Sequence, residues 1–163
     1  MTQTLYIFGT SGLAREARDV AVETGWSVIF VAKSREDVNR WRGEEPVIHE
    51  ADIPQGVNCA IGIGDNRIRR KVALRHSSQV FPSLIHPSAS FGYRQAERLQ
   101  GKQGLIICAG ARFMSQIEIG DFVVADLNCT IGHDVIIGDY VLIAPGANVA
   151  GYVEMREGVW LGS

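Results

Sequence analysis

His133 and Gly151 are the residues of this sequence whose types and spacing best support chemistry. A histidine accepts a proton near neutral pH, and a glycine offers a backbone N–H that no side chain obstructs. A base beside such a donor suits acyl transfer, because the N–H polarises the carbonyl group that is attacked. Asp134 follows the histidine and is a candidate for orienting its imidazole, although neighbouring strand residues normally point to opposite faces.

His133 has two other interpretations, a surface residue without a function and a metal ligand. A surface histidine without a function stays open, but His133 is the only histidine between residues 107 and 161, and it follows the uncharged segment Cys129–Gly132. A zinc site usually needs three protein ligands. One histidine per chain supplies three only on a three-fold axis, which leaves no room for a cleft, so we expect no metal.

The spacing of eighteen matters because the C-terminal half repeats every six residues. An apolar residue occupies every sixth position, namely Ile107, Phe113, Ile119, Ala125, Ile131, Ile137, Ile143, Val149, Met155 and Leu161. The residue four places after each of the first nine is also apolar. At an apolar fraction of 46%, these nineteen matches have chance odds of about 4 × 10⁻⁷.

A period of six is typical of a hexapeptide β-helix, in which three hexads close one coil of a prism. Residues eighteen apart then stack about 4.8 Å apart. Glycine or asparagine recurs at hexad position four of one face (Gly110, Asn128 and Gly146), which predicts a left-handed backbone at that corner. Ile85 and Ile107 are 22 residues apart, so we expect a four-residue insertion within 93–104. Such prisms generally wind left-handed, although the period itself does not reveal the hand.

The N-terminal half has the alternating pattern of an α/β domain. We expect a small Rossmann-like parallel sheet, with strands and helices at Leu5–Phe8, Leu13–Glu23, Trp26–Ala32, Val57–Ile63, Arg67–His76 and Phe81–Ile85. Segment 33–50 is polar and contains Trp41 and Pro46, and its pattern predicts neither a helix nor a strand. The expected domains are residues 1–84, a nucleotide-sugar-binding unit, and residues 85–163, the β-helix.

Two glycine turns follow strands of this sheet. The first contains Gly9, Ser11 and Gly12, and the second is Gly62-Ile63-Gly64-Asp65-Asn66. Backbone N–H groups at a strand-to-helix turn bind phosphate well, and ligands of open α/β sheets bind beyond the carboxyl ends of the strands. Either turn alone could be a plain tight turn, but two of them at one edge favour a phosphate-bearing ligand.

Composition excludes several classes of function. A net charge of −2 argues against a nucleic acid as the main partner, and we interpret the cluster Arg67, Arg69, Arg70 and Lys71 as a solvated helix face. No apolar run is long enough to cross a bilayer. The N-terminus resembles a strand more than a secretion signal, and three cysteines form no disulfide framework. We therefore expect a cytoplasmic protein.

Several motifs together resemble the left-handed β-helix sugar acetyltransferases, the sialic acid O-acetyltransferase family and the bacillosamine-pathway N-acetyltransferases. The matching segments are Ile7–Glu16, Ile61–Asn66 with Arg69, Ile85–Ala89, Ile131–Tyr140, Pro145–Ala147 and Ala150–Gly151. The resemblance implies an α/β domain followed by a left-handed parallel β-helix of hexapeptide repeats.

The resemblance also implies roles for individual residues. His133 would be the general base, and Gly151 would bind the carbonyl group of the co-substrate acetyl-CoA. The turns at Gly9, Ser11 and Gly12 and at Gly64, Asp65 and Asn66 would hold the nucleotide-linked sugar. Relatives are homotrimers with active sites between neighbouring prisms.

The chain departs from these relatives in three places. Leu13 stands where many have a histidine, and Val31-Ala32-Lys33-Ser34 stands where many have an acidic pair. Relatives continue for several more coils, so either C-terminal coils are missing here or the prism of this protein is short. We also expect outward apolar residues to be covered by neighbouring prisms, namely Phe122, Val124, Ile136, Tyr140, Leu142 and Tyr152.

The resulting hypothesis is an acetyl-CoA-dependent acetyltransferase acting on the amino group of a nucleotide-linked amino sugar. One alternative is O-acetylation of sialic acid or a related sugar. The other is a trimeric scaffold that binds a nucleotide sugar without catalysis. The sequence names neither the sugar nor the nucleotide.

Overall fold

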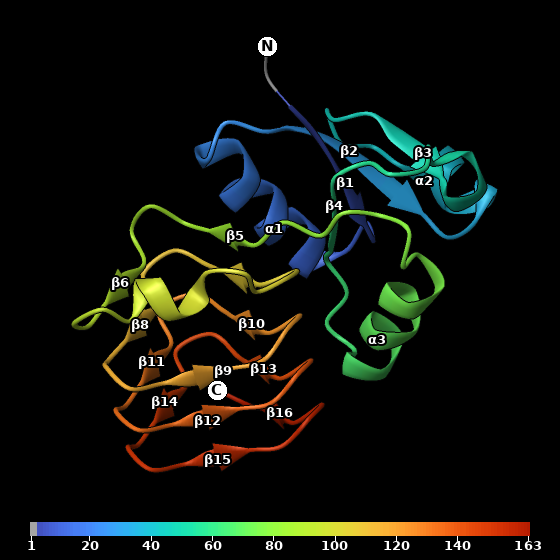
Figure 1. Ribbon diagram of the computed structural model, residues 1–163. Coiled ribbons are helices and arrows are strands. Elements are labelled where there is room, and N and C mark those ends of the chain that lie inside the picture. The colour runs from blue at the N-terminus through green and yellow to red at the C-terminus, as the bar shows by residue number, and fades with distance from the viewer. Residues whose placement is uncertain (1–2) are drawn as a thin grey trace.

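The computed structural model describes residues 3–163 as an α/β unit joined to a triangular β-helix (Figure 1). The N-terminal unit is a parallel sheet with strand order β3-β2-β1-β4. Its strands are β1 (Thr4–Phe8), β2 (Ser27–Ala32), β3 (Val47–His49) and β4 (Cys59–Ile61). Its helices are α1 (Gly12–Glu23), α2 (Arg35–Arg40), α3 (Asn66–Arg75) and the 3₁₀ turn η1 (Glu50–Asp52).

Local sequence explains where these elements begin. The apolar positions of α1 (Leu13, Ala14, Ala17, Val20 and Ala21) follow helical spacing and are all buried. Asp65 caps α3, because its carboxylate accepts a hydrogen bond from the Ile68 amide at 2.9 Å. The uncertain segment 33–50 contains α2 and the edge strand β3. Both predicted helices, now α1 and α3, and the first three predicted strands are confirmed within a few residues.

The expectation that Phe81–Ile85 forms a strand of this sheet is wrong. Only β5 (Leu84–Ile85) is extended, and it pairs with the β-helix. The Leu84 amide donates to the Leu105 carbonyl at 2.8 Å. Pro82 has no N–H to donate to a ladder, and the N-terminal sheet ends at a single bridge between Asn58 and Val80. The fourth strand of the sheet is β3.

Residues 84–163 form a three-sided β-helix built from two-residue strands, which is called the prism below. One wall contains β5, β7 (Ile106–Ile107), β10 (Val124–Ala125), β13 (Leu142–Ile143) and β16 (Trp160–Leu161). The second contains β6 (Ser90–Phe91), β8 (Arg112–Phe113), β11 (Thr130–Ile131) and β14 (Asn148–Val149). The third contains β9 (Glu118–Ile119), β12 (Ile136–Ile137) and β15 (Glu154–Met155).

The predicted register is confirmed. Val124 pairs with Ile106 and Leu142, each eighteen residues away. Ile85 pairs with Ile107 at the predicted spacing of 22. The extra residues form the 3₁₀ turn η2 (Ala96–Leu99). The repeated apolar residues fill the centre of the prism, and Leu99 of η2 joins them at its end.

The left-handed backbone extends beyond the predicted corner. Gly110, Asn128 and Gly146 have φ of 71°, 56° and 70°, as expected. The same hexad position has positive φ at the other corners too, at Arg94, Gln116, Phe122, Asp134, Tyr140, Tyr152 and Gly158. The corner geometry of the coil therefore imposes this conformation even where the residue type does not favour it.

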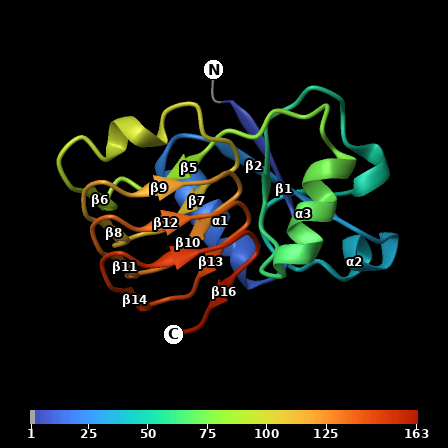
Figure 2. The same cartoon turned by 60° about the horizontal axis from the view of Figure 1, so that its bottom comes forward.

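The N-terminal unit covers one wall of the prism (Figure 2). Helix α1 packs against β5 and β7, and its core includes Val124 and Leu142, which are 0% and 5% exposed. Phe122 and Tyr140 pack into the cluster around Phe81. The expectation that neighbouring chains cover these four wall residues is therefore wrong, because the chain's own α/β unit covers them.

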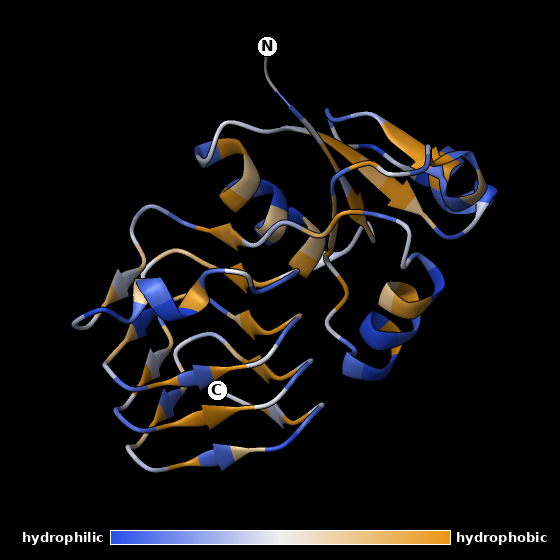
Figure 3. Ribbon diagram, in the orientation of Figure 1, coloured by the Kyte–Doolittle hydropathy of each residue, from blue (hydrophilic) through white to orange (hydrophobic). Residues whose placement is uncertain are grey.

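Only part of the expected apolar surface is exposed. Ile136 and Tyr152 are 46% and 77% exposed. Figure 3 shows β12 as a hydrophobic strand between the more hydrophilic β9 and β15. The remaining apolar surface lies on the side of the prism away from the N-terminal unit.

Arg69 holds the two parts together. Its side chain is 1% exposed and donates hydrogen bonds to the carbonyl oxygens of Ile63 at 2.9 Å, Phe122 at 3.2 Å and Tyr140 at 2.7 Å. Burial lowers the pKa of Arg69 to about 10, and the guanidinium therefore stays charged at neutral pH. The interpretation of the whole basic cluster as a solvated face is wrong for Arg69, because these carbonyl groups replace water around its charge.

We predict that Arg69→Ala lowers the free energy of unfolding by about 3 kcal/mol or more, because each hydrogen bond to a charged donor contributes roughly 1.5–3 kcal/mol. Urea unfolding measures this change. The control Arg70→Ala removes an exposed ion pair with Glu157 and should cost about 0–1 kcal/mol. Equal losses in the two variants would contradict the role of Arg69.

Candidate functional site

His133 lies in the turn between β11 and β12, at the prism corner opposite the wall that the N-terminal unit covers. Its side chain is 46% exposed. The same corner contains Ser115 and Gln116 one coil before it and Gly151 and Tyr152 one coil after it. We call these stacked turn residues the His133 corner.

Asp134 contacts the imidazole directly. Its Oδ2 lies 2.8 Å from His133 Nδ1, and both side chains are partly exposed. The strand argument against this pairing fails, because Asp134 is a corner residue with φ of 56° and not part of a strand. Since a carboxylate only accepts hydrogen bonds, Nδ1 carries the proton in this pair and Nε2 is the basic nitrogen.

Gly151 lies immediately beneath the ring. A Cβ atom on Gly151 would come within 2.9 Å of His133 Cε1 and Nε2. The Gly151 amide donates no hydrogen bond to any residue in the range 3–163. The Gly151 backbone therefore combines an N–H without a partner among the described residues with close contact to the imidazole, an arrangement that suits acyl transfer.

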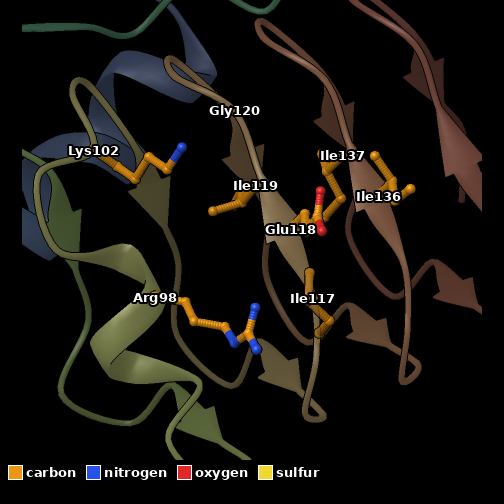
Figure 4. Close-up of a pocket in the computed structure, with 8 residues that line it drawn as sticks. All are labelled: Arg98, Lys102, Ile117, Glu118, Ile119, Gly120, Ile136 and Ile137. Carbon is orange, nitrogen blue, oxygen red and sulfur yellow. The ribbon is translucent and has the colours of Figure 1, made fainter.

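The turn η2 lies next to the His133 corner, because its residues Glu97 and Arg98 line a cavity together with Gln116. A cavity of about 470 Å³ is lined by Tyr93, Arg94, Glu97, Arg98 and Gln116. A second cavity of about 450 Å³ lies beside it, with Arg98 and Lys102 on one side and Glu118 and Ile136 on the other (Figure 4). Neither cavity was anticipated, because only the fold turns the insertion toward this wall.

The predicted glycine turns meet only in part. A Cβ on Gly9, which has φ of 107°, would lie 2.8 Å from the Gly62 carbonyl oxygen, so the two turns touch. Ser11 and Gly12 are exposed at the start of α1, and Ser11 makes no side-chain cap hydrogen bond. These three residues lie beyond the carboxyl end of β1, where the open-sheet argument expects a ligand.

Gly64, Asp65 and Asn66 face a different cavity of about 440 Å³, which Gly158 and Trp160 also line. The Asn66 amide donates to the Gly158 carbonyl at 2.9 Å, and its oxygen accepts from Arg69 at 3.0 Å. The side chains of Asp65 and Asn66 therefore already have structural partners. The structure does not bring this trio into one cavity with Gly9.

Basic side chains that the sequence did not associate with the Gly9 turn line a cavity beside it. A cavity of about 400 Å³ at the ends of β1 and β2 is lined by Gly9, Lys33, Lys71 and Arg75, together with Glu50, which pairs with Arg75 at 2.9 Å. Lys71 belongs to the cluster interpreted as a solvated face. Its spacing of four from Arg75 was the available signal.

The cysteines offer no nucleophile. Burial raises the pKa of the Cys59 thiol to about 12 and that of Cys129 to about 12, and it raises the pKa of Cys108 further. Such thiols stay protonated at neutral pH. Among residues 3–163, no group of three or more His, Cys, Asp or Glu side chains is arranged to hold a metal ion. No helix in the same range is long and apolar enough to cross a membrane.

Comparison with known proteins identifies a family model and relatives that resemble this chain. Residues 4–75 match the family model described as the PglD N-terminal domain. The chain is 31% identical over 106 residues to a GDP-perosamine N-acetyltransferase of Escherichia coli O157:H7, a match that covers 63% of this chain and 46% of the relative. The resemblance to the sugar acetyltransferase family is confirmed. The matched region is less than half of that relative's length.

Solved structures share the complete fold. PerB from Caulobacter crescentus in complex with CoA and GDP-perosamine aligns over 99% of this chain and 78% of its own, with a TM-score of 0.81 and 21% identity. The acetyltransferase domain of PglB from Neisseria gonorrhoeae FA1090 aligns over 99% and 89%, with a TM-score of 0.75 and 19% identity. The expected class, an α/β domain followed by a left-handed β-helix, is confirmed.

We predict that Gly151→Ala displaces the His133 ring and weakens its hydrogen bond to Asp134. The added Cβ would lie 2.9 Å from the ring, while the φ of Gly151 lies outside the left-handed region, so the effect is steric and not backbone strain. The ring resonances of His133 in NMR spectra report the displacement. In the control Gly12→Ala the new Cβ meets nothing within 4 Å, and the His133 resonances should not move. Unchanged resonances in Gly151→Ala would contradict the stacking.

Proposed function

We propose that this protein is an acetyl-CoA-dependent N-acetyltransferase acting on the amino group of a nucleotide-linked amino sugar. The observation that carries the proposal is the His133 corner, where the Asp134-bound imidazole lies 2.9 Å from the site of a Cβ on Gly151. The GDP-perosamine N-acetyltransferase relative makes a GDP-linked amino sugar the first substrate to test.

In this mechanism the sugar amine attacks the carbonyl carbon of the acetyl thioester while His133 Nε2 accepts a proton from the amine. The oxyanion of the tetrahedral intermediate accepts a hydrogen bond from the Gly151 N–H. The carbon–sulfur bond then breaks, and the CoA sulfur leaves with the proton returned by the imidazolium. Asp134 holds Nδ1 and stabilises the charged ring. The amide and free CoA are the products, and no enzyme nucleophile is needed.

We propose that Gly9, Ser11 and Gly12 bind the diphosphate of the sugar nucleotide, because backbone N–H groups at the start of α1 suit an anion. Lys33 and Lys71 add positive charge to the same edge of the sheet. Gly64, Asp65 and Asn66 shape the neighbouring turn. In this proposal residues 1–84 bind the nucleotide and residues 85–163 carry out acetyl transfer. We also propose a cytoplasmic location, where acetyl-CoA and nucleotide sugars are made.

The positions of the two sites support assembly into a homotrimer. The Gly9 turn belongs to the unit that covers one prism wall, whereas His133 lies at the opposite corner of the same prism. A sugar bound at the turn is therefore better placed to reach His133 of a neighbouring chain. Ile136 and Tyr152, near that corner, are exposed and available for such packing.

We predict that His133→Ala lowers kcat by about 10²–10⁴-fold, because general-base catalysis contributes that much. Release of free thiol from acetyl-CoA measures the rate, with GDP-, UDP- and dTDP-linked amino sugars and free sialic acid as acceptors. His86→Ala, which removes a histidine at a different corner of the prism, where Ser88 contacts both His86 and Gly110, serves as the control. A variant that keeps more than about a third of wild-type turnover would remove His133 from the mechanism. Turnover of sialic acid alone would favour O-acetylation, and binding without turnover of any acceptor would favour the scaffold.

A mixing experiment tests the shared site. We expect light scattering to give the mass of three chains. His133→Ala and Gly9→Val should each be inactive alone, since a side chain on Gly9 meets the Gly62 carbonyl. Trimers refolded from a mixture of both variants should regain activity at sites that combine the intact halves of two chains. An active monomer, or a mixture without regained activity, would refute the shared site.

A further inference from the structure

Tyr152 occupies a backbone conformation that its residue type disfavours. Its φ is 63°, in the left-handed region where glycine and asparagine are tolerated best. Its side chain is nevertheless 77% exposed. A bulky aromatic residue at such a position has a conformational cost, and burial of its ring does not offset that cost.

Other aromatic residues at the same hexad position have a packing reason. Phe122 and Tyr140 also have positive φ, but their rings stack with centroids 5.2 Å apart and an angle of 3°. Phe81 packs edge-on against Phe122, and the group joins the core beneath α3. Burial compensates for strain there, whereas Tyr152 belongs to no such cluster.

The ring of Tyr152 instead contacts His133. The two ring centroids are 5.1 Å apart, and the planes are nearly perpendicular at 88°. This is the edge-to-face geometry that aromatic pairs favour. The imidazole therefore has Asp134 at Nδ1, the Gly151 backbone beneath it and Tyr152 at its side. Because the imidazole is 46% exposed, few other groups restrict its rotation.

We propose that Tyr152 is a positioning residue that holds the His133 imidazole over Gly151 in the orientation needed for proton transfer. The inference rests on the proposed acetyltransferase function. It assigns the ring of Tyr152, and not its hydroxyl group, to this role, since the ring itself meets the imidazole edge-to-face. The hydroxyl group donates no hydrogen bond to any residue in the range 3–163. The strained backbone at Tyr152 is then retained because the aromatic ring it carries orients the imidazole of His133.

The decisive variant is Tyr152→Asn, because asparagine suits a left-handed corner but has no aromatic ring. We expect its melting temperature to equal or exceed that of the wild type, while kcat falls by roughly 3- to 10-fold, the range that corresponds to an aromatic pair. The KM values for acetyl-CoA and for the sugar nucleotide should change less than twofold. A structural role would instead lower the melting temperature together with the activity.

Two further variants complete the test. Tyr152→Phe keeps the ring and should retain wild-type kcat. Gln116→Asn makes the same kind of change at a corner residue that also has φ of 63°, two coils earlier, and is compared by melting temperature alone. Its shift shows what asparagine itself contributes to the stability of such a corner, and Tyr152→Asn should show a shift of the same sign. Wild-type kcat in Tyr152→Asn, or a Phe variant as slow as the Asn variant, would overturn the inference. If His133→Ala is inactive while Tyr152→Asn is fully active, only the role of Tyr152 fails and the proposed function stands.

Discussion

The fixed coil length of eighteen residues is the constraint on which the rest of this structure depends. Parallel pairing at that interval stacks Ile106, Val124 and Leu142 in one wall, and the same interval stacks His133 on Gly151. A single residue inserted between His133 and Gly151 would move Gly151 away from the corner where it stacks on His133. It would also shift the apolar residues that follow out of the prism core. Within residues 84–163, the irregular coil lies between β5 and β7, where η2 carries the insertion. There Gln95 exchanges two hydrogen bonds of 2.9 Å with the backbone of Ile117, as a neighbouring strand would.

The corners of the prism link this regularity to chemistry. Each coil must turn three times, and the turn residues adopt a left-handed backbone whatever their type. At Asp134 this conformation brings the carboxylate back toward the preceding imidazole. At Tyr152 it directs an aromatic ring toward the same imidazole. The candidate base is thus oriented by residues that are themselves held in place by coil geometry, and no loop has to be ordered first.

The packing between the α/β unit and the prism decides which surfaces are left for other molecules. Helix α1 and the Arg69 hydrogen bonds fix the unit on one wall. They bury Val124 and Leu142 and leave the His133 corner free on the far side. A buried guanidinium that binds main-chain carbonyls orients the two parts more strictly than apolar contact does, because its hydrogen bonds are directional. This fixed separation of nucleotide turn and base is the basis for proposing a site shared between chains.

The sequence alone determined the elements whose physics is local or periodic. The six-residue apolar period predicts the prism, its register and the insertion after Ile85. It also predicts that His133 stacks on Gly151, because the two residues are eighteen positions, or one coil, apart. It did not reveal which outward residues are covered, because burial of Val124 and Leu142 depends on a helix that lies more than 100 residues earlier. The sequence also misled about two segments of the N-terminal half. Arg69 is buried because it binds carbonyl groups of the prism such as that of Tyr140, and Leu84–Ile85 pairs with β7 of the prism instead of the N-terminal sheet. Asp134 and Tyr152 join the site only through the left-handed corners. Contacts between distant segments, and backbone conformations that a closed coil enforces against residue preference, belong to the tertiary structure, since no local pattern records them.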